Sequence, residues 1–308
     1  SLISIGNNTF KDCSSLTSIT IPNRVKGIGE YTFANCTALT SAIFPDTLTS
    51  IGNYAFYGCS SLKTITIPNS VKTIGEYAFA RCERIISMTI PNSVTSIGRN
   101  IFSGCNGLTS VILSNAITSI SEYAFGDCVN LSTIKIPDSV TIINADAFRG
   151  CSGLKNVFIP KTVNTIRDKA FNNNNITFYC EPLNKPSGWV SYWNENKGTV
   201  YWGVSFIEDS VAYYITSETT VTITKYFGNK ESFVVPQTVI HDGNNYNVVG
   251  IAENAFSDCS NLALVTILDN IETIEQKAFN NMGITFYCEA NGTPDGWNSN
   301  WNNNAGIV

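Results

Sequence analysis

The sequence predicts a solenoid, in which short and similar coils of chain stack on one another. Seven cysteines recur at a constant interval of 23 residues, at Cys13, Cys36, Cys59, Cys82, Cys105, Cys128 and Cys151. Phenylalanine recurs at the same interval, at Phe10, Phe33, Phe56, Phe79, Phe102, Phe125, Phe148 and Phe171. A fixed period of about 20 to 50 residues is typical of repeat proteins. Because so short a unit is too small to bury its own apolar side chains, stacked units must bury them in continuous columns.

The third repeat, from Cys59 to Cys82, shows the expected elements in order. Residues 62–67 predict a short strand, because apolar and polar residues alternate there and β-branched residues dominate. Pro68 should mark the strand end, because proline has no N–H to donate to a ladder. Residues 74–79 then predict a turn followed by a short helical stretch. We expect the strands of successive coils to pair in parallel, about 4.8 Å apart.

The consensus C-S-x-L-x-x-I-x-I-P-x-x-V-x-x-I-G-x-x-A-F-x-x-C resembles the leucine-rich repeats of the BspA-like bacterial surface protein family. The resemblance covers residues 2–171 and 251–279. It implies a right-handed leucine-rich repeat solenoid with a parallel β-sheet on the concave face, and with short helical turns and coil on the convex side. It also implies a cell-surface or secreted protein that binds a protein or glycan ligand on a host or neighbouring cell.

Breaks in the register predict five parts. Asn174 occupies the position after Phe171 where the repeat has a cysteine. The sequence Ile-Thr-Phe-Tyr-Cys-Glu then occurs at residues 176–181 and again at 284–289. Val308 matches Val200 of the first copy, which continues further, so we expect the second copy to be incomplete. The parts are a repeat array (1–175), a Trp-containing end-module (176–203), a β-hairpin and re-entry repeat with a loop insertion (204–250), a second repeat block (251–283) and a second end-module (284–308).

The segment before the second block predicts local β-structure. Residues 211–215 and 221–226 alternate around a polar stretch, which indicates the β-hairpin that interrupts the solenoid. Residues 233–236 restore a strand followed by proline. Residues 242–245, within an insertion, should loop out as a turn. His241, the one histidine, lies in the same insertion, and we expect an exposed loop residue there rather than a catalytic group.

Two pairs of tryptophans stand in the end-modules, Trp189 with Trp193 and Trp297 with Trp301. Members of a pair are four residues apart, so a helical turn would place both on one face. Such a face could stack against sugar rings, or it could form a cap that seals the open end of the core. Their position at the end of each array favours the cap.

The outward column of the predicted strands is the candidate ligand contact. It lies between two inward positions and contains Ile43, Thr66, Thr89, Ile112, Lys135 and Phe158. Hydroxyl side chains there can simply solvate the sheet. Apolar residues on a solvated face can also mark a contact surface. A second column, Tyr31, Tyr54, Tyr77 and Tyr123, is expected to pack against the next coil.

Composition and missing motifs restrict the function. Charged residues make up 14% of the chain and the net charge is −5 with no basic cluster, which argues against nucleic-acid binding. No apolar run approaches the roughly 20 residues of a membrane helix, so we expect no membrane insertion within these residues. No nucleotide or hydrolase motif and no C-x-x-C pair occurs, so we expect no cofactor, no zinc and no catalysis. The cysteines could form a disulfide ladder, but stacked side chains that point the same way favour free, buried thiols.

These observations lead to three functional hypotheses. The first is a non-catalytic, cell-surface or secreted scaffold for protein binding or adhesion. The second is a structural spacer that presents another domain. The third is carbohydrate binding through the tryptophan end-modules.

Overall fold

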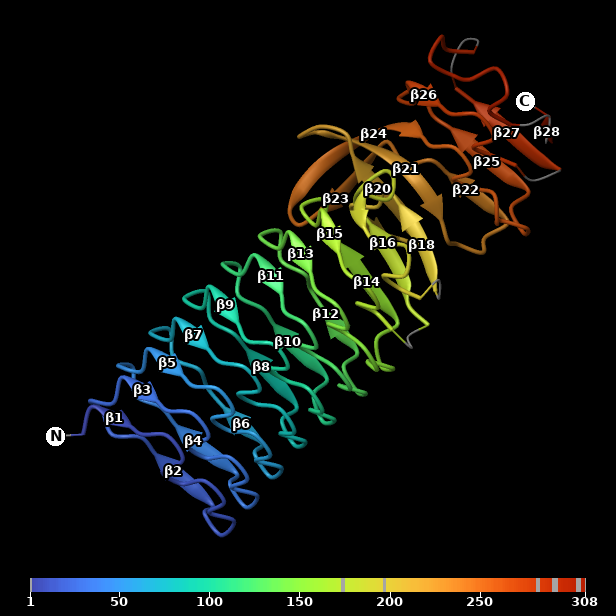
Figure 1. Ribbon diagram of the computed structural model, residues 1–308. Coiled ribbons are helices and arrows are strands. Elements are labelled where there is room, and N and C mark those ends of the chain that lie inside the picture. The colour runs from blue at the N-terminus through green and yellow to red at the C-terminus, as the bar shows by residue number, and fades with distance from the viewer. Residues whose placement is uncertain are drawn as a thin grey trace. The chain divides into compact units, whose positions relative to one another are not determined.

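Two ladders of short parallel strands build the coils of the first of two compact units, which contains residues 1–179 and 184–201. The computed structural model describes residues 2–172, 175–195, 198–280, 283–289, 293–302 and 306–307, so Asn174 and Val308 lie outside the described residues. Figure 1 shows the two ladders as rows of arrows with odd and even labels. The five-part division stays a prediction.

The odd ladder contains one two-residue strand per coil. One group is β1 (Ser4–Ile5), β3 (Gly27–Ile28), β5 (Ser50–Ile51), β7 (Thr73–Ile74) and β9 (Ser96–Ile97). The next is β11 (Ser119–Ile120), β13 (Ile142–Ile143), β15 (Thr165–Ile166) and β17 (Gly188–Trp189). Partner residues are one repeat apart, as in Ile51 with Ile74, so the period of the sequence is the register of the ladder.

The even ladder forms three groups of three strands. The first is β2 (Ser18–Thr20), β4 (Ser41–Ile43) and β6 (Thr64–Ile65). The second is β8 (Ser87–Thr89), β10 (Ser110–Ile112) and β12 (Thr133–Ile134), and the third is β14 (Asn156–Ile159), β16 (Thr177–Cys180) and β18 (Thr199–Trp202). The strands from β2 to β14 are those that the L-x-x-I-x-I segments predict, and their parallel pairing is confirmed, whereas β16 and β18 follow the last such segment.

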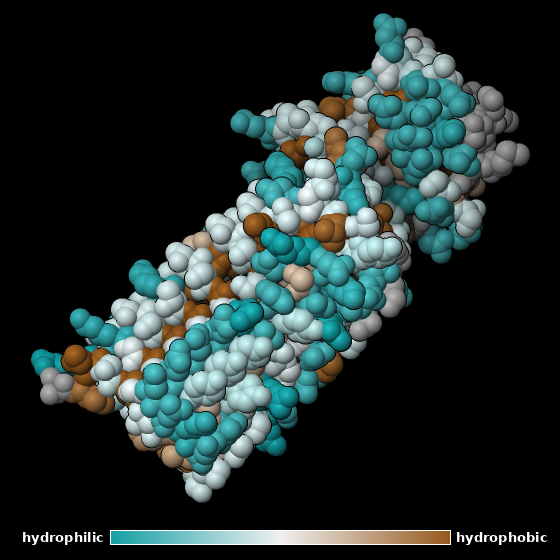
Figure 2. Space-filling view, viewed as in Figure 1, coloured by the Kyte–Doolittle hydropathy of each residue, from teal (hydrophilic) through white to brown (hydrophobic). Residues whose placement is uncertain are grey.

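The phenylalanine column forms the centre of the first unit. Phe33, Phe56 and Phe79 are fully buried, and consecutive rings stack with centroids 5.1 and 5.6 Å apart. Burying one such side chain contributes about 1.5–3 kcal/mol, and each coil adds another. Figure 2 shows the outside of the same unit, where like residues follow one another from coil to coil as narrow hydrophobic and polar rows. The predicted column is therefore core.

The predicted short helical turns are wrong. The described residues contain no helix, and the segment after each Ile-Gly pair forms turns. Tyr31 and Tyr54 have φ values of 52° and 55°, in the left-handed region that a right-handed helix excludes. The backbone N–H groups of these turns donate to the next coil, as Phe33 does to Ala55 at 2.8 Å, instead of forming bonds four residues back. The handedness and curvature implied by the resemblance stay predictions.

The second unit, residues 180–183 and 202–308, contains a mixed sheet and a parallel sheet. The mixed sheet has the order β19 (Phe206–Glu208), β20 (Val211–Ile215), β21 (Thr220–Tyr226), β24 (Asn244–Ile251) and β23 (Thr238–His241), and β26 (Thr273–Ile274) also pairs with β24. The parallel sheet is β22 (Ser232–Val234), β25 (Leu264–Ile267), β27 (Ile284–Cys288) and β28 (Gly306–Ile307). The predicted hairpin is confirmed as the antiparallel pair β20 and β21.

The insertion forms a second antiparallel hairpin, β23 with β24. The expected turn is confirmed at Asp242 and Gly243, whose φ values are 48° and 80°, while residues 244–245 belong to β24. Asp-Gly is a preferred pair for such a turn. His241 is a half-buried strand residue and not an exposed loop residue. Its Nδ1 lies 2.8 Å from the Oε1 of Glu208, and its ring stacks on that of Phe206 at 4.1 Å.

Candidate functional site

The outward column of the even ladder presents apolar side chains to solvent. In β10, Val111 is buried beneath the strand while Ile112 is 65% exposed. Ile43 is 61% exposed and Phe158 is 41% exposed. Thr66, Thr89 and Lys135, which complete the predicted column, are also exposed. The alternation of the strand thus places all six candidate residues on the accessible face of the ladder, as expected from the sequence.

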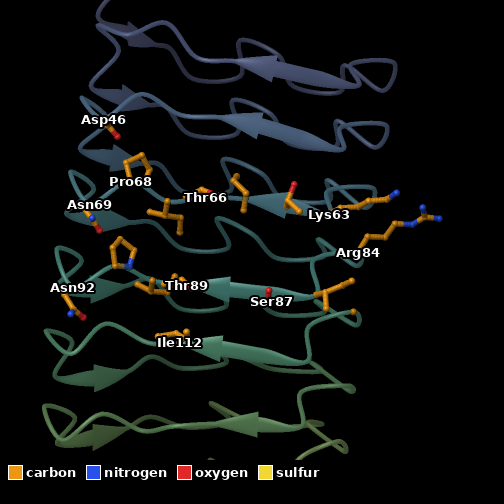
Figure 3. A pocket seen from close by; sticks show the side chains of 17 residues that line it. Asp46, Lys63, Thr66, Pro68, Asn69, Arg84, Ser87, Thr89, Asn92 and Ile112 are labelled. Atoms are coloured by element: carbon orange, nitrogen blue, oxygen red, sulfur yellow. The ribbon is translucent and has the colours of Figure 1, made fainter.

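A groove crosses this face at the boundary between the first two strand groups. Its volume is about 1370 Å³, and its walls are residues 63–69 of one coil and residues 84, 86, 87 and 89–92 of the next, with Ile112 beyond them. Figure 3 shows Thr66 and Thr89 along the middle of the groove. Ile86, 62% exposed, adds an apolar side chain that the outward column does not contain.

The two ends of the groove differ in charge. Lys63 and Arg84 extend together at one end, and Asn69, Asn92 and Asp46 lie at the other (Figure 3). Both basic side chains belong to exposed residues, and neither has an ion-pair partner among the residues that the structure describes. The groove therefore has a cationic end on a chain whose net charge is −5.

An aromatic ladder continues the outward column past Phe158. Its ring stacks on that of Tyr179 at 4.9 Å, and Tyr179 stacks on Tyr201 at 5.7 Å. Burial raises the pKa of Tyr179, and the nearby Tyr201 adds to the effect. The sequence prediction missed this ladder because the spacing shortens to 21 and then 22 residues. The alternation of the Thr-Phe-Tyr-Cys segment was the available signal.

The first tryptophan pair lies within the core. Trp189 is 1% exposed and its Nε1 donates to the carbonyl oxygen of Val163 at 3.0 Å. Trp193 is also buried, edge to face with Phe171 and with Phe178 at 5.9 and 4.6 Å. Trp189 lies in the strand β17 and Trp193 in the turn after it, so the two indoles do not lie on a helical face. Their rings are covered by protein, so no indole face is open to a sugar.

The second pair repeats this arrangement within its own unit. Trp297 and Trp301 are buried, and Trp297 Nε1 donates to the carbonyl oxygen of Ile271 at 3.0 Å. Trp301 lies edge to face with Phe279 at 5.8 Å and with Phe286 at 4.8 Å. This burial favours the cap over the glycan contact for both pairs.

Six of the seven thiols in the cysteine column donate a hydrogen bond to the preceding coil. All ten cysteines are free, and most are buried, but Cys13 is exposed and Cys288 is partly exposed. Burial raises the pKa of Cys36 to about 11 and that of Cys105 to about 12. The buried thiols are therefore protonated at neutral pH.

The described residues contain no group of three or more His, Cys, Asp or Glu side chains placed to hold a metal ion. The same part of the chain contains no helix that is long and apolar enough to cross a membrane.

A family model described as the BspA type leucine rich repeat region, in six copies, matches residues 3–128, 72–182 and 205–290. The match covers well over half of the chain. The chain has no significant match among curated proteins.

Solved structures with similarity to the chain are bacterial repeat proteins. A leucine rich cell surface protein from Faecalibacterium prausnitzii is 27% identical, with a TM-score of 0.47, and the match covers 96% of this chain and 66% of that protein. A leucine-rich repeat protein from Bacteroides ovatus is 24% identical, with a TM-score of 0.58 and coverage of 96% and 78%. A leucine rich repeat protein of T. pallidum is 31% identical over 50% of this chain and 72% of that one, with a TM-score of 0.47. The Bacteroides match supports the fold, and this chain spans about two thirds of the Faecalibacterium protein.

Proposed function

Because this chain belongs to the BspA-type leucine-rich repeat family, we propose that it is a non-catalytic scaffold at the cell surface or outside the cell. Its partner is a protein of a host or neighbouring cell, and the outward face of the even ladder is the binding surface.

The observation that supports binding is the exposure of large apolar side chains on a regular, polar strand face. Ile43, Ile112 and Phe158 present well over a third of their surface to solvent while neighbouring coils carry threonine or lysine there. The core is built from the inward positions, so it does not need Ile43 or Ile112, while Phe158 also stacks on Tyr179. Burying one of them against a partner would contribute about 1.5–3 kcal/mol, which is the size of an interface hot spot.

Because all four tryptophans are buried, the proposed partner is a protein and not a glycan. Sugar recognition through an indole needs an open ring face, and these rings pack against Phe171, Phe178, Phe279 and Phe286. A protein partner can instead cover the apolar residues of the even ladder.

The test is a binding screen of the purified chain against matrix proteins and glycans, repeated with the double variant Ile112→Ala and Phe158→Ala. We expect at least one protein to bind the unchanged chain, and the double variant to bind it at least tenfold more weakly. A matched control is Val129→Ala with Val190→Ala, which removes exposed apolar side chains outside the outward column. Binding that the double variant leaves unchanged would refute the proposed surface.

A further inference from the structure

The even ladder opens between its third and fourth coils while the odd ladder stays paired there. β7 and β9 remain hydrogen-bonded in register, with Thr73 opposite Ser96. On the even ladder, β6 ends one group of strands and β8 begins the next. The groove lies at this break. The two coils are thus joined on one side and parted on the other.

The break leaves backbone groups without the bonds that their counterparts make. Lys63 N–H donates to Thr40 at 3.1 Å, and Thr109 N–H donates to Ile86 at 2.8 Å. Within the described residues, the bond expected between these two, from Ile86 N–H to the Lys63 carbonyl oxygen, does not form.

The other end of the opened strands also lacks a bond, though not as a consequence of the break. Ile90 N–H donates to the carbonyl oxygen of Ile112 at 2.8 Å, but in the described part of the chain Ile67 N–H makes no such bond to Thr89. The same is true of Phe44 N–H to Thr66 and Leu113 N–H to Lys135, in coils whose strands stay paired. All four residues at the two missing bonds between the parted coils line the groove or adjoin it. When an extended polypeptide adds to a sheet as a strand, its backbone hydrogen-bonds to backbone donors and acceptors of this kind.

Length and charge restrict that polypeptide further. The wall formed by residues 63–69 holds seven residues, and at about 3.3 Å per residue it spans roughly 20 Å, enough for a peptide of similar length. The exposed ammonium of Lys63 and guanidinium of Arg84 stand together at one end of this wall (Figure 3). An exposed cationic pair favours an acidic side chain nearby, and the long-range attraction weakens as salt is added.

We propose that the groove between β6 and β8 binds an extended segment of the partner protein, about six or seven residues long. An acidic side chain at one end of this segment lies against Lys63 and Arg84, and its backbone bonds to the freed groups along the groove. This inference rests on the proposed function and specifies the form in which the partner meets the even ladder.

The test uses an immobilised library of random seven-residue peptides with blocked ends, probed with the labelled, purified chain. We expect Asp and Glu to be enriched at one end of the bound peptides. The double variant Lys63→Glu with Arg84→Glu should enrich Lys and Arg at that end, and it should bind the best original peptide at least fivefold more weakly. Lys72→Glu, a charge reversal at an exposed residue of the same coil but outside the groove and the outward column, should change neither result.

The outcomes separate this inference from the proposed function. No enriched peptide, or an acidic preference that survives the double charge reversal, overturns the inference. If the peptide experiment fails in this way but partner binding in the protein screen still depends on Ile112 and Phe158, the proposed function is retained. Equal melting temperatures of the charge variants and the original chain exclude unfolding as the cause of any change.

Discussion

The Sγ of Cys59 lies 3.1 Å from the carbonyl oxygen of Phe33, a residue of the preceding coil. The same bond joins Cys82 to Phe56 at 3.2 Å. Four more members of the column repeat it: Cys36 with Phe10, Cys105 with Phe79, Cys128 with Phe102, and Cys151 with Phe125. Each of these six thiols thus donates to a backbone oxygen at the stacked phenylalanine, so the cysteine column and the phenylalanine column stabilise the same contact between coils.

Phe79→Asp should destabilise the first unit severely. Phe79 is fully buried between Phe56 and Phe102, so the variant removes the ring contacts and places an unpaired carboxylate in the core. Loss of the ring alone costs about 3–5 kcal/mol. Thermal unfolding followed by circular dichroism measures the effect, and Lys135→Asp is the exposed control. A melting temperature equal to that of the unchanged chain would mean that the phenylalanine column is not core.

Thiol labelling should separate Cys13 from the buried column. In the native state we expect rapid labelling of the exposed Cys13 and slow labelling of Cys59, which is fully buried. Unfolding without reductant should release nearly all ten thiols. Only a few thiols after unfolding would instead indicate a cross-linked ladder.

Alkaline pH should reduce stability through the cysteine column. Burial raises the pKa of Cys36 from 9.0 to about 11, so the folded state holds this proton more tightly than the unfolded state does. Its contribution is therefore complete below pH 9 and is lost as the pH rises toward 11. Cys36→Ala should show a smaller fall in melting temperature over that range. Identical pH profiles of the two proteins would contradict the assignment.

Trp189→Phe should test the cap in the first unit. The variant keeps an aromatic ring but removes the Nε1 donor, which leaves the Val163 carbonyl oxygen without this bond. A lost hydrogen bond of this kind costs about 1 kcal/mol, whereas Trp189→Ala should cost about 3–5 kcal/mol through the cavity. Urea unfolding measures both values. If both variants are as stable as the original chain, Trp189 does not stabilise the first unit as a cap.

Acid should weaken the contact between Lys225 and Asp258 in the second unit. The Lys225 ammonium lies 2.7 Å from Asp258 Oδ2 and lowers the pKa of that carboxyl, mainly through the hydrogen bond. The contribution is present above the usual carboxyl pKa of 3.8 and is lost as the pH falls through the lower value of the folded state. Asp258→Asn should flatten the acid limb of the melting-temperature profile, and an unchanged limb would contradict the role of this pair.

The constant period made the stacking predictable, because a residue at one position of the repeat meets its equivalent in the next coil. The burial of Phe79, the exposure of Ile112 and the stacking of Tyr54 on Tyr77 at 4.6 Å all follow from that rule. The tyrosine column was predicted to pack against the next coil, and it does so.

The missed features depend on geometry that the repeat consensus does not specify. The segment after Gly75 contains good helix formers, but the positive φ of Tyr77 and bonds to the neighbouring coil form turns instead. The groove was missed because its walls follow the consensus closely, with Ile85 and Met88 in place of the usual Leu and Ile, and unmade hydrogen bonds between coils leave no mark in the sequence. Tyr179 was missed because its spacing departs from the period.

Hydrogen exchange of the chain with and without its protein partner tests the central claim most directly. We predict slower exchange of backbone amides in the even ladder, in residues 63–69, 84–92 and 110–112, when the partner binds. Amides of the odd ladder, such as those of β7 and β9, should exchange at unchanged rates. Protection restricted to the odd ladder, or none on either ladder with the partner saturating, would contradict binding at the outward face.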